Sequence, residues 1–470
     1  MTAPAPEATE KVLSTLNSDG SRRWLEPRLS RGRFLRRRFA VAWGLIALFT
    51  LLPYLRINGK PPILLDVPNR RFTLFGTTFL PTDTMFLMLL LLGIFVTIFL
   101  LTALFGRVWC GWACPQTVYL EFVYRPIERL TGGKSPWSRK LGLDRFPSGV
   151  RRIVRFVLYV ALSMFLAHTF LAYFVGVESL ARWVRSSPFV HPVAFAVMAL
   201  TTVLMLLDFA WFREQVCLVA CPYGRFQSVL LDRRSVIVGY DPHRGEPRRR
   251  PRDREPGETA GDCIDCGACV ITCPTGIDIR DGLQMECVHC TQCIDACDAI
   301  MDRVGKPRGL IRYSSQAELA DEPHRMLRPR VIAYPVLLLV VVGLLSTTLA
   351  RRQSADVTVL RGLGTPYAEL GSGLISNQLR VKVVNRTEEP RAYTVEVLDE
   401  PAIEIVSPDN PLNLDAGAAG TAILFLNAPR ELFRGGGHEL RLRVSDGVDF
   451  DRTMDWKILG PFDGAIGGAP

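Results

Sequence analysis

The organisation of this chain is decided by the stretch Cys263-Ile-Asp-Cys266-Gly-Ala-Cys269-Val-Ile-Thr-Cys273-Pro274. A second run follows with the same C-x2-C-x2-C-x3-C spacing, Cys287-Val-His-Cys290-Thr-Gln-Cys293-Ile-Asp-Ala-Cys297-Asp298. Three thiolates at this interval can wrap three corners of one iron–sulfur cubane, while the fourth points away from it. The two runs therefore belong together, because each fourth cysteine needs a site outside its own run.

The expected ligand sets cross between the two runs. This spacing is typical of bacterial ferredoxins with two 4Fe–4S clusters, in which the fourth cysteine of each run ligates the other cluster. We therefore expect one cluster on Cys263, Cys266, Cys269 and Cys297, and the other on Cys287, Cys290, Cys293 and Cys273. Paired zinc sites are the alternative, but zinc motifs usually consist of two separated C-x2-C knuckles. Because Asp298 stands where the first run has a proline, we expect the two clusters to differ in potential.

Five apolar runs surround this segment, and a membrane helix needs about 20 such residues. They are Phe39–Leu55, Thr84–Phe105, Phe156–Val177, Ser186–Leu207 and Val331–Leu349. The first of them is the shortest. The net charge of +10 comes largely from arginines beside these runs, which indicates a membrane and not nucleic acid as the partner.

Lysine and arginine are unevenly distributed between the connecting segments. Residues 1–38, 106–152 and 212–330 are rich in them, whereas residues 178–185 contain only Arg182 and Arg185. The positive-inside rule then predicts a bacterial inner-membrane protein with a cytoplasmic N-terminus and a periplasmic C-terminus. The expected order is a cytoplasmic tail (1–38), four spans (39–230), a cytoplasmic two-cluster ferredoxin (231–330), a fifth span (331–350) and a periplasmic domain (355–470).

The remaining four of the twelve cysteines lie just after apolar runs, in Cys110-Gly-Trp-Ala-Cys114-Pro115 and Cys217-Leu-Val-Ala-Cys221-Pro222. On a helix this spacing places both sulfurs on one face, and the proline ends or kinks the helix. Soft thiolates suit Cu(I), so Cys110, Cys114, Cys217 and Cys221 are candidate copper-binding and redox-active residues. Two alternatives stay open: cysteines that only pack, and one site shared by all four sulfurs, such as a third cluster.

Three further ionisable residues lie in or beside the spans. His168 and His191 are expected on the periplasmic side, where they could approach each other and share a metal or haem. A hydrogen-bonded structural role is favoured for both, because the chain has no C-x-x-C-H haem motif. Asp208 lies at the cytoplasmic end of the fourth span, where a carboxylate is a functional candidate; pairing with Arg213 is the structural alternative.

Short alternating segments dominate the chain after residue 349. Leu379, Val381 and Val383 share one face of the segment 378–384, and the pattern returns at 393–398, 422–426 and 439–444. Several short strands separated by turn residues predict a β-sandwich. Because no catalytic constellation lies in this region, we expect it to serve interaction or positioning.

The order of these features resembles the cytochrome c oxidase accessory protein family, also called CcoG, FixG or RdxA. The most specific stretches are Trp109–Gln116, Cys217–Gly224 and Cys263–Tyr313, the last ending in Arg308-Gly-Leu-Ile-Arg-Tyr313. The resemblance implies an immunoglobulin-like C-terminal domain and cluster binding by the eight ferredoxin cysteines. It also implies that the four C-x3-C-P cysteines bind or reduce copper, from Cu(II) to Cu(I), during assembly of the cbb-type haem–copper oxidase.

We therefore expect a multi-domain membrane protein: an α-helical bundle of about five spans, an inserted two-cluster ferredoxin-like domain and a C-terminal all-β sandwich. The favoured function is a cupric reductase, with copper chaperones or oxidase assembly factors as partners and an unidentified electron donor. An electron relay between the quinone pool and a partner reductase, and a non-enzymatic copper-holding assembly factor, are the alternatives. A homodimer is left open. A dedicated dehydrogenase is disfavoured, because neither a dinucleotide-binding fingerprint nor a P-loop is present.

Overall fold

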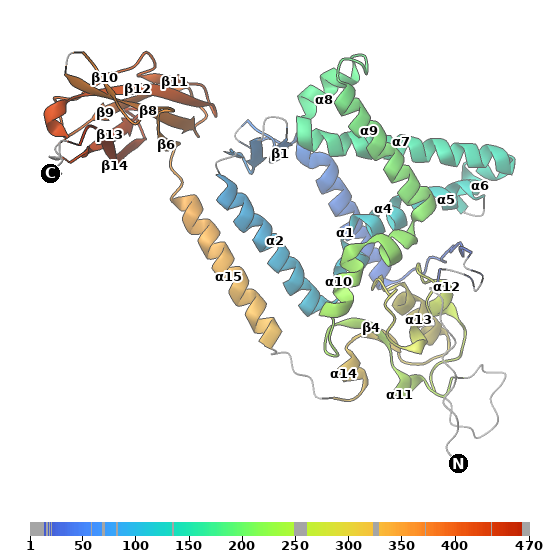
Figure 1. The fold of residues 1–470 in the computed structure, drawn as a ribbon. Helices are drawn as coiled ribbons and strands as arrows, with labels where there is room; N and C mark the ends of the chain where they lie inside the picture. Colours follow the sequence, from blue (N-terminus) through green and yellow to red (C-terminus); the bar gives the residue numbers. More distant parts are fainter. Residues whose placement is uncertain are drawn as a thin grey trace. The chain divides into compact units, whose positions relative to one another are not determined.

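The structure is a computed structural model that describes residues 14–15, 17, 19, 21–57, 59–67, 71–80, 83–133, 136–248, 261–322, 329–371, 373–433 and 435–462 (Figure 1). Residues 1–13 of the expected cytoplasmic tail lie outside this range. The chain divides into two compact units. One comprises Met1–Asp66 with Leu89–Val342, and the other comprises Val67–Met88 with Gly343–Pro470.

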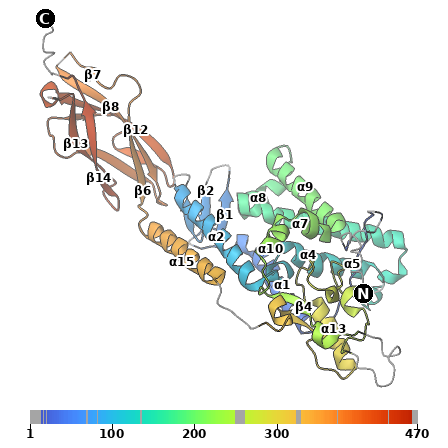
Figure 2. The ribbon, with the colours of Figure 1, turned by 60° about the horizontal axis from the view of Figure 1, so that its bottom comes forward.

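Within the described residues, four helical segments are long and apolar enough to cross a bilayer. α2 (Thr84–Phe105) and α15 (Pro329–Ala350) match the second and fifth expected spans. α7 (Ser148–Val175) contains most of the third, and α9 (Pro192–Leu206), continued by a π-helical turn (Leu207–Phe212), contains most of the fourth. Many of their large apolar side chains are exposed, as expected of surfaces that face hydrocarbon and not water. α7 and α9 lie side by side (Figures 1 and 2).

The first expected span differs from the other four. Its residues form the end of α1 (Arg33–Leu51) and a 3-10 turn (Leu52–Tyr54). Because α1 opens with Arg-Phe-Leu-Arg-Arg-Arg, its apolar part is residues 39–51, about 20 Å at 1.5 Å per residue. That is shorter than the roughly 30 Å of a bilayer core. The fourth span also starts later than expected, because a separate helix, α8 (Val177–Val184), precedes Pro192.

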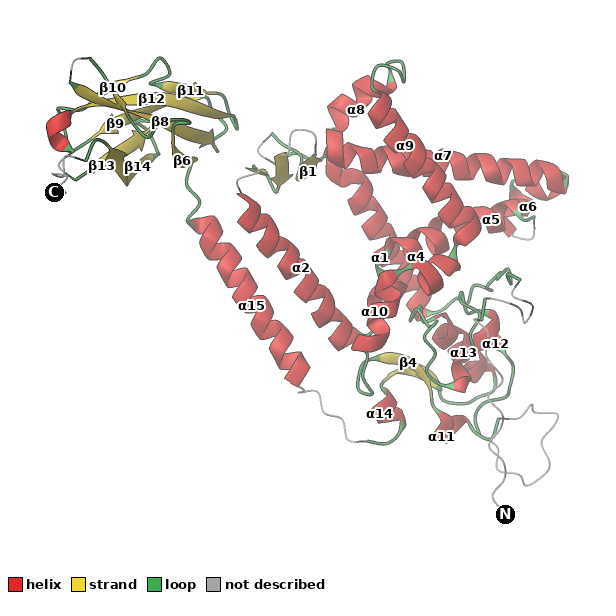
Figure 3. Ribbon diagram, viewed as in Figure 1, coloured by secondary structure: helices red, strands yellow, loops and turns green. Residues whose placement is uncertain are grey.

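The ferredoxin region is built mainly from loops around short elements (Figure 3). β4 (Ile237–Tyr240) pairs antiparallel with β5 (Ile311–Ser314), and α12 (Ala268–Ile271) packs against α13 (Gln292–Arg303). Val238, Ile294 and Met301 are each 1% exposed and lie in one core with several of the cysteines. This small apolar core holds the cysteine loops in place.

The start of α1 is attached to the ferredoxin region. Asp295, on α13, accepts hydrogen bonds from the backbone N–H groups of Phe34 (3.1 Å) and Leu35 (2.7 Å). A carboxylate at this position caps free donors and favours the positive end of the helix dipole. α1 therefore begins where the ferredoxin supplies its cap.

Two antiparallel sheets form the C-terminal domain, with strand orders β10-β12-β8-β6 and β11-β9-β13-β14, and β7 pairs with β8. The predicted segments lie in β8, β9, β12 and β13, and Leu379 stands opposite Leu424 in the register of the first sheet. Tyr393 and Leu442 belong to the same buried core. The predicted sandwich is confirmed. Its strands are β6 (Ala355–Arg361), β7 (Ala368–Glu369), β8 (Leu374–Asn385), β9 (Arg391–Val397), β10 (Glu404–Val406), β11 (Leu412–Leu414), β12 (Ala419–Pro429), β13 (Gly437–Ser445) and β14 (Asp451–Leu459).

The remaining elements are short. They are β1 (Ile63–Asp66), β2 (Arg71–Leu74), β3 (Thr77–Phe79), α3 (Val108–Trp112), α4 (Pro115–Tyr119), α5 (Arg125–Thr131), α6 (Pro136–Lys140), α10 (Pro222–Leu230), α11 (Pro242–Gly245) and α14 (Gln316–Leu319). π-helical turns at Leu120–Tyr124 and Val216–Ala220 join α4 to α5 and precede α10.

Candidate iron–sulfur and thiol sites

Two cavities in the ferredoxin region collect the eight cysteines of the two runs. The first is lined by Cys273, Cys287, Cys290 and Cys293, and the second by Cys263, Cys266 and Cys297, with Cys269 lining both. Each cavity therefore contains three cysteines of one run and the fourth cysteine of the other. This is the grouping that crossed ligation requires.

The two cysteine runs have the same backbone conformation at equivalent positions. Asp265 and His289, each just before the second cysteine of its run, have φ of 48° and 52°. Gly267 and Thr291, each just after that cysteine, have φ of 66° and 60°. Non-glycine residues rarely adopt this left-handed conformation, so its repetition marks a loop shape that both sites need.

The thiols suit a cationic metal group. Burial raises the pKa of Cys269, Cys287, Cys290 and Cys297 to about 12. Buried thiolates gathered around a cavity are stable only when cations offset their charge, so metal binding and thiol deprotonation are coupled. The residues present thus fit 4Fe–4S clusters, for which cysteine thiolates are the usual ligands.

Both C-x3-C-P motifs break the helix at the same place. α3 ends at Trp112 and Cys114 is extended (φ −61°, ψ 127°), and α4 begins at Pro115. Cys221 is likewise extended (φ −72°, ψ 112°), and α10 begins at the proline that follows it. The predicted break at each proline is confirmed. The placement of both sulfurs on one helix face is wrong, because the second cysteine of each motif precedes a new helix whose first residue is proline.

The four cysteines of these motifs lie near one another. Burial, together with the thiols of Cys114 and Cys221, raises the pKa of Cys110 to about 12. Burial also raises the pKa of Cys217, with Cys114 and Cys110 adding to the shift. In the described part of the chain, however, no three His, Cys, Asp or Glu side chains are placed to hold one metal ion. The four thiols of the two motifs are nevertheless close enough to one another to raise the pKa of Cys110 and of Cys217.

The first motif is pressed against a cysteine loop of the ferredoxin. The carbonyl oxygens of Val288 and His289 lie 2.7 Å and 2.5 Å from where a Cβ on Gly111 would stand. Arg38 holds the other side of this turn, because its Nε donates a hydrogen bond to the Gly111 carbonyl at 2.9 Å. Only glycine allows the two backbones to approach this closely.

Arg107 connects this loop to both motifs. Its backbone N–H donates to Nδ1 of His289 at 3.2 Å, and its guanidinium donates to the carbonyls of Met285 and Gly224, the latter at 3.1 Å. Gly224 follows the second motif, and Arg107 precedes the first. His289 is 1% exposed, and burial lowers its pKa to about 3, so the ring is neutral and accepts this hydrogen bond.

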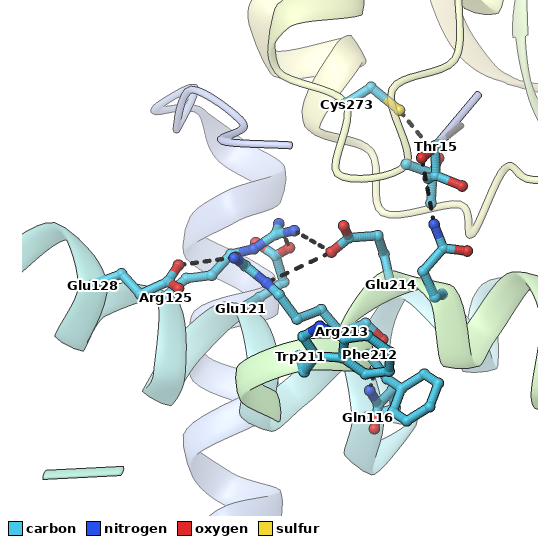
Figure 4. Close-up of polar contacts among 12 residues, drawn as sticks. Thr15, Gln116, Glu121, Arg125, Glu128, Trp211, Phe212, Arg213, Glu214 and Cys273 are labelled. Atoms are coloured by element: carbon cyan, nitrogen blue, oxygen red, sulfur yellow. Dashed lines mark hydrogen bonds and ion pairs between the residues drawn. The ribbon is translucent and has the colours of Figure 1, made fainter. Parts of the chain in front are cut away.

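A buried ion-pair network lies beside the motifs (Figure 4). Glu214, 3% exposed, lies 3.4 Å from Arg125 and 3.8 Å from Arg213. Arg125 also pairs with Glu121, and Arg213 pairs with Glu128 at 2.9 Å. The sequence analysis missed this network. Two sequence features could have predicted it: the i,i+4 spacing of Glu121 and Arg125, and the Arg-Glu pair directly after an apolar span.

The structural alternative, in which Asp208 pairs with the side chain of Arg213, is wrong. Oδ1 of Asp208 accepts a hydrogen bond from Nε2 of Gln116 at 2.7 Å. Gln116 also donates to the backbone carbonyl of Arg213 at 3.0 Å, while the Arg213 guanidinium faces the glutamates. Asp208 therefore anchors the turn that follows Cys114.

The two histidines have separate surroundings. His168 lies 2.7 Å from the carbonyl of Met164, one helical turn earlier, through its Nδ1. His191 stacks on Trp183 with ring centroids 4.5 Å apart. His168 therefore has a structural role through a hydrogen bond, and His191 has one through stacking on Trp183.

Three family models match this chain. A 4Fe–4S binding domain matches residues 87–137, a 4Fe–4S dicluster domain matches residues 212–316, and an IG-like fold at the C-terminal of FixG matches residues 345–458. The dicluster match contains all eight ferredoxin cysteines and the second C-x3-C-P motif, and the first match contains the other motif.

Curated proteins of similar sequence span most of the chain. Protein RdxA of Cereibacter sphaeroides is 33% identical over 441 residues, which are 89% of this chain and 93% of RdxA. The nitrogen fixation protein FixG of Rhizobium meliloti is 32% identical over 81% of this chain and 80% of its own. Protein RdxB of Cereibacter sphaeroides is 33% identical over 82% and 84%.

Proposed function

This chain belongs to the FixG/RdxA family of membrane iron–sulfur electron-transfer proteins, and we propose that it reduces Cu(II) to Cu(I) for assembly of a cbb-type haem–copper oxidase. One observation carries the proposal: the four C-x3-C-P thiols lie near one another, and Gly111 of the first motif contacts the backbone of the cysteine loop 287–290. An electron source is thereby placed next to soft ligands that prefer Cu(I).

The chain's own residues divide the work between them. The eight ferredoxin cysteines would hold the 4Fe–4S clusters, which supply one-electron carriers when bound. Cys110, Cys114, Cys217 and Cys221 bind the copper substrate, and each Cu(II) takes up one electron to become Cu(I).

The contact at Gly111 indicates which of the two cluster cavities lies nearer to the copper thiols. Cys287 and Cys290 flank the carbonyls that touch Gly111, so their cavity is the nearer one to the copper thiols. The cavity of Cys263 and Cys266 is then the entry side for electrons. Arg38, bonded to Gly111, and Arg107, bonded to His289, hold the first C-x3-C-P motif against the cysteine loop.

The proposed setting is the bacterial inner membrane. Arginines 38, 107 and 213 occupy the same end of the spans as the ferredoxin, which the positive-inside rule places in the cytoplasm. The C-terminal sandwich is then periplasmic. Copper chaperones or oxidase assembly factors receive the Cu(I), and an electron donor of the cytoplasm refills the ferredoxin.

The test is anaerobic reduction of the purified protein, removal of excess reductant, and addition of Cu(II) with a Cu(I)-specific chromogenic chelator. We expect bleached cluster absorption to return as the Cu(I) chelate appears, one electron for each copper. Return of the absorption without Cu(I) would refute copper reduction and favour an electron relay to another partner. A copper-holding factor without reductase activity would bind copper and leave the reduced absorption unchanged.

A third iron–sulfur cluster on the four motif cysteines is the second candidate. It is favoured by the match of a 4Fe–4S binding domain to residues 87–137, which contain Cys110 and Cys114. The double variant Cys110→Ala with Cys217→Ala distinguishes a copper site from a third cluster. For a copper site, iron content is unchanged and copper binding falls. For a third cluster, iron content falls by about a third.

A further inference from the structure

A basic cavity lies between the start of α1 and the turn that leads into α5. It has a volume of about 650 Å³ and is open to solvent, and its walls include Arg31, Arg36, Arg38 and Arg129. Glu121 is the one carboxylate among the lining residues, and it already pairs with Arg125. The cavity therefore carries a positive charge that its own walls do not neutralise.

The arginines of the cavity have unused donors. Arg38 is 1% exposed and its Nη2 is buried with no hydrogen-bond partner among the described residues. In that part of the chain, Arg31 and Arg36 also make no side-chain hydrogen bond or ion pair, and Arg129 makes no side-chain hydrogen bond, although its charge interacts with Glu121 and Glu128. A buried guanidinium donor without a partner is costly, which indicates that a ligand completes this site.

The rest of the wall is apolar. Leu35, Phe39 and Phe122 line the cavity, and the guanidinium of Arg38 lies over the Phe122 ring at 5.3 Å. Phe39 is also 54% exposed and Trp43, one turn further along α1, is 44% exposed. An apolar strip thus leads out of the basic cavity along α1.

The cavity lies at the membrane edge. Arg38 bonds to Gly111, six residues after α2 ends at Phe105. Basic pockets at such positions between helices bind lipid head groups, and arginine matches phosphate geometry well. We propose that this cavity binds the phosphate of an anionic phospholipid, with an acyl chain along Leu35, Phe39 and Trp43.

The experiment uses the full-length protein in detergent, titrated with phosphatidylglycerol and followed by native mass spectrometry. The test variants are Arg36→Gln alone and Arg36→Gln with Arg129→Gln. The control for the single variant is Arg37→Gln, which removes one charge from α1 outside the cavity. We expect both test variants to bind the lipid more weakly, the double variant at least about tenfold, and the control to bind it like the parent. Iron content reports whether each variant is folded.

Three results would overturn the proposal. One is unchanged lipid binding in the double variant, and another is an equal loss in Arg36→Gln and Arg37→Gln, which would mean a diffuse surface effect. The third is displacement of the lipid by inorganic phosphate at equal concentration, which would mean a site for free phosphate. If the double variant loses iron, Arg31→Gln provides the same comparison through a single change of an exposed residue.

Discussion

The carbonyl oxygen of His289 lies 2.5 Å from the position that a Cβ on Gly111 would occupy. A cysteine loop of the ferredoxin and the first C-x3-C-P motif thus meet backbone to backbone, with no side chain between them. Residues separated by 178 positions in the chain share one contact on which the proposed electron path depends.

Gly111→Ala should separate these two parts. The added methyl group collides with the His289 carbonyl, so the loop 287–290 must shift. We expect the rate of Cu(I) formation to fall at least about tenfold, because small displacements of reacting groups are costly, while cluster absorption stays intact. Gly44→Ala is the control, since a Cβ there meets nothing within 4 Å. An unchanged rate of Cu(I) formation in Gly111→Ala would show that electron transfer to copper does not depend on this contact.

Crossed ligation can be tested by comparing cysteine variants in pairs. Cys273 shares a cavity with Cys287, and Cys297 shares one with Cys263. Electron paramagnetic resonance of the reduced protein should show Cys273→Ser and Cys287→Ser altering the same cluster signal. Cys297→Ser and Cys263→Ser should alter the other. If Cys273→Ser instead changes the signal that Cys263→Ser changes, ligation is not crossed.

Asp298 gives the two clusters different surroundings. It follows Cys297, is 6% exposed, and its Oδ1 accepts the backbone N–H of Gly309 at 3.0 Å. Removing a nearby negative charge raises a cluster potential, so Asp298→Asn should raise one of the two midpoint potentials by on the order of tens of millivolts. Asp302→Asn, on the same helix but exposed and paired with Arg308, should move neither. Equal shifts in both variants would contradict a local effect of Asp298.

The sequence predicted most reliably what depends on spacing within a short segment. The cysteine runs, the breaks at Pro115 and Pro222, and the alternating strands all follow from local chemistry, and the structure agrees with them. The apolar run from Phe39 starts inside a longer helix, and length and hydropathy do not reveal where that helix begins. α1 starts six residues earlier, at Arg33, where Asp295 of the ferredoxin caps it.

Features that join distant segments carried almost no signal. Arg125 and Glu214 are 89 positions apart, and neither shows by periodicity that it will be buried. The Gly111 contact likewise depends on how two loops pack, because a glycine between Cys110 and Trp112 has many possible uses. The eight cluster cysteines could therefore be grouped from the sequence, but their attachment to the membrane helices could not.

Glu214→Ala should destabilise the protein strongly. It removes the carboxylate between Arg125, 2% exposed, and Arg213, 7% exposed. Each buried guanidinium then keeps only one glutamate, Glu121 or Glu128. Breaking such a buried pair costs about 3–5 kcal/mol. Thermal unfolding in detergent should show a large loss of stability. Glu178→Ala, in a surface ion pair where Glu178 is 67% exposed, should cost less than about 1 kcal/mol. Similar losses in both variants would mean that the network adds no more than a surface pair.

Asp446 should make the C-terminal sandwich sensitive to acid. Burial alone would raise the pKa of Asp446, but the backbone N–H groups of residues 448–450, at 2.9–3.0 Å, and Arg391 hold it below its ordinary value of 3.8. Because folding favours the carboxylate, its contribution is complete above that value and is lost as the pH falls through the lower folded pKa. The hydrogen-exchange protection factors of residues 437–459 in the full chain, corrected for the intrinsic rate at each pH, should fall over that range. In Asp446→Asn the segment should exchange faster at neutral pH and lose this acid step, while Asp409→Asn, at an exposed residue, should keep it. An identical acid profile in Asp446→Asn and the parent protein would assign the step to another group.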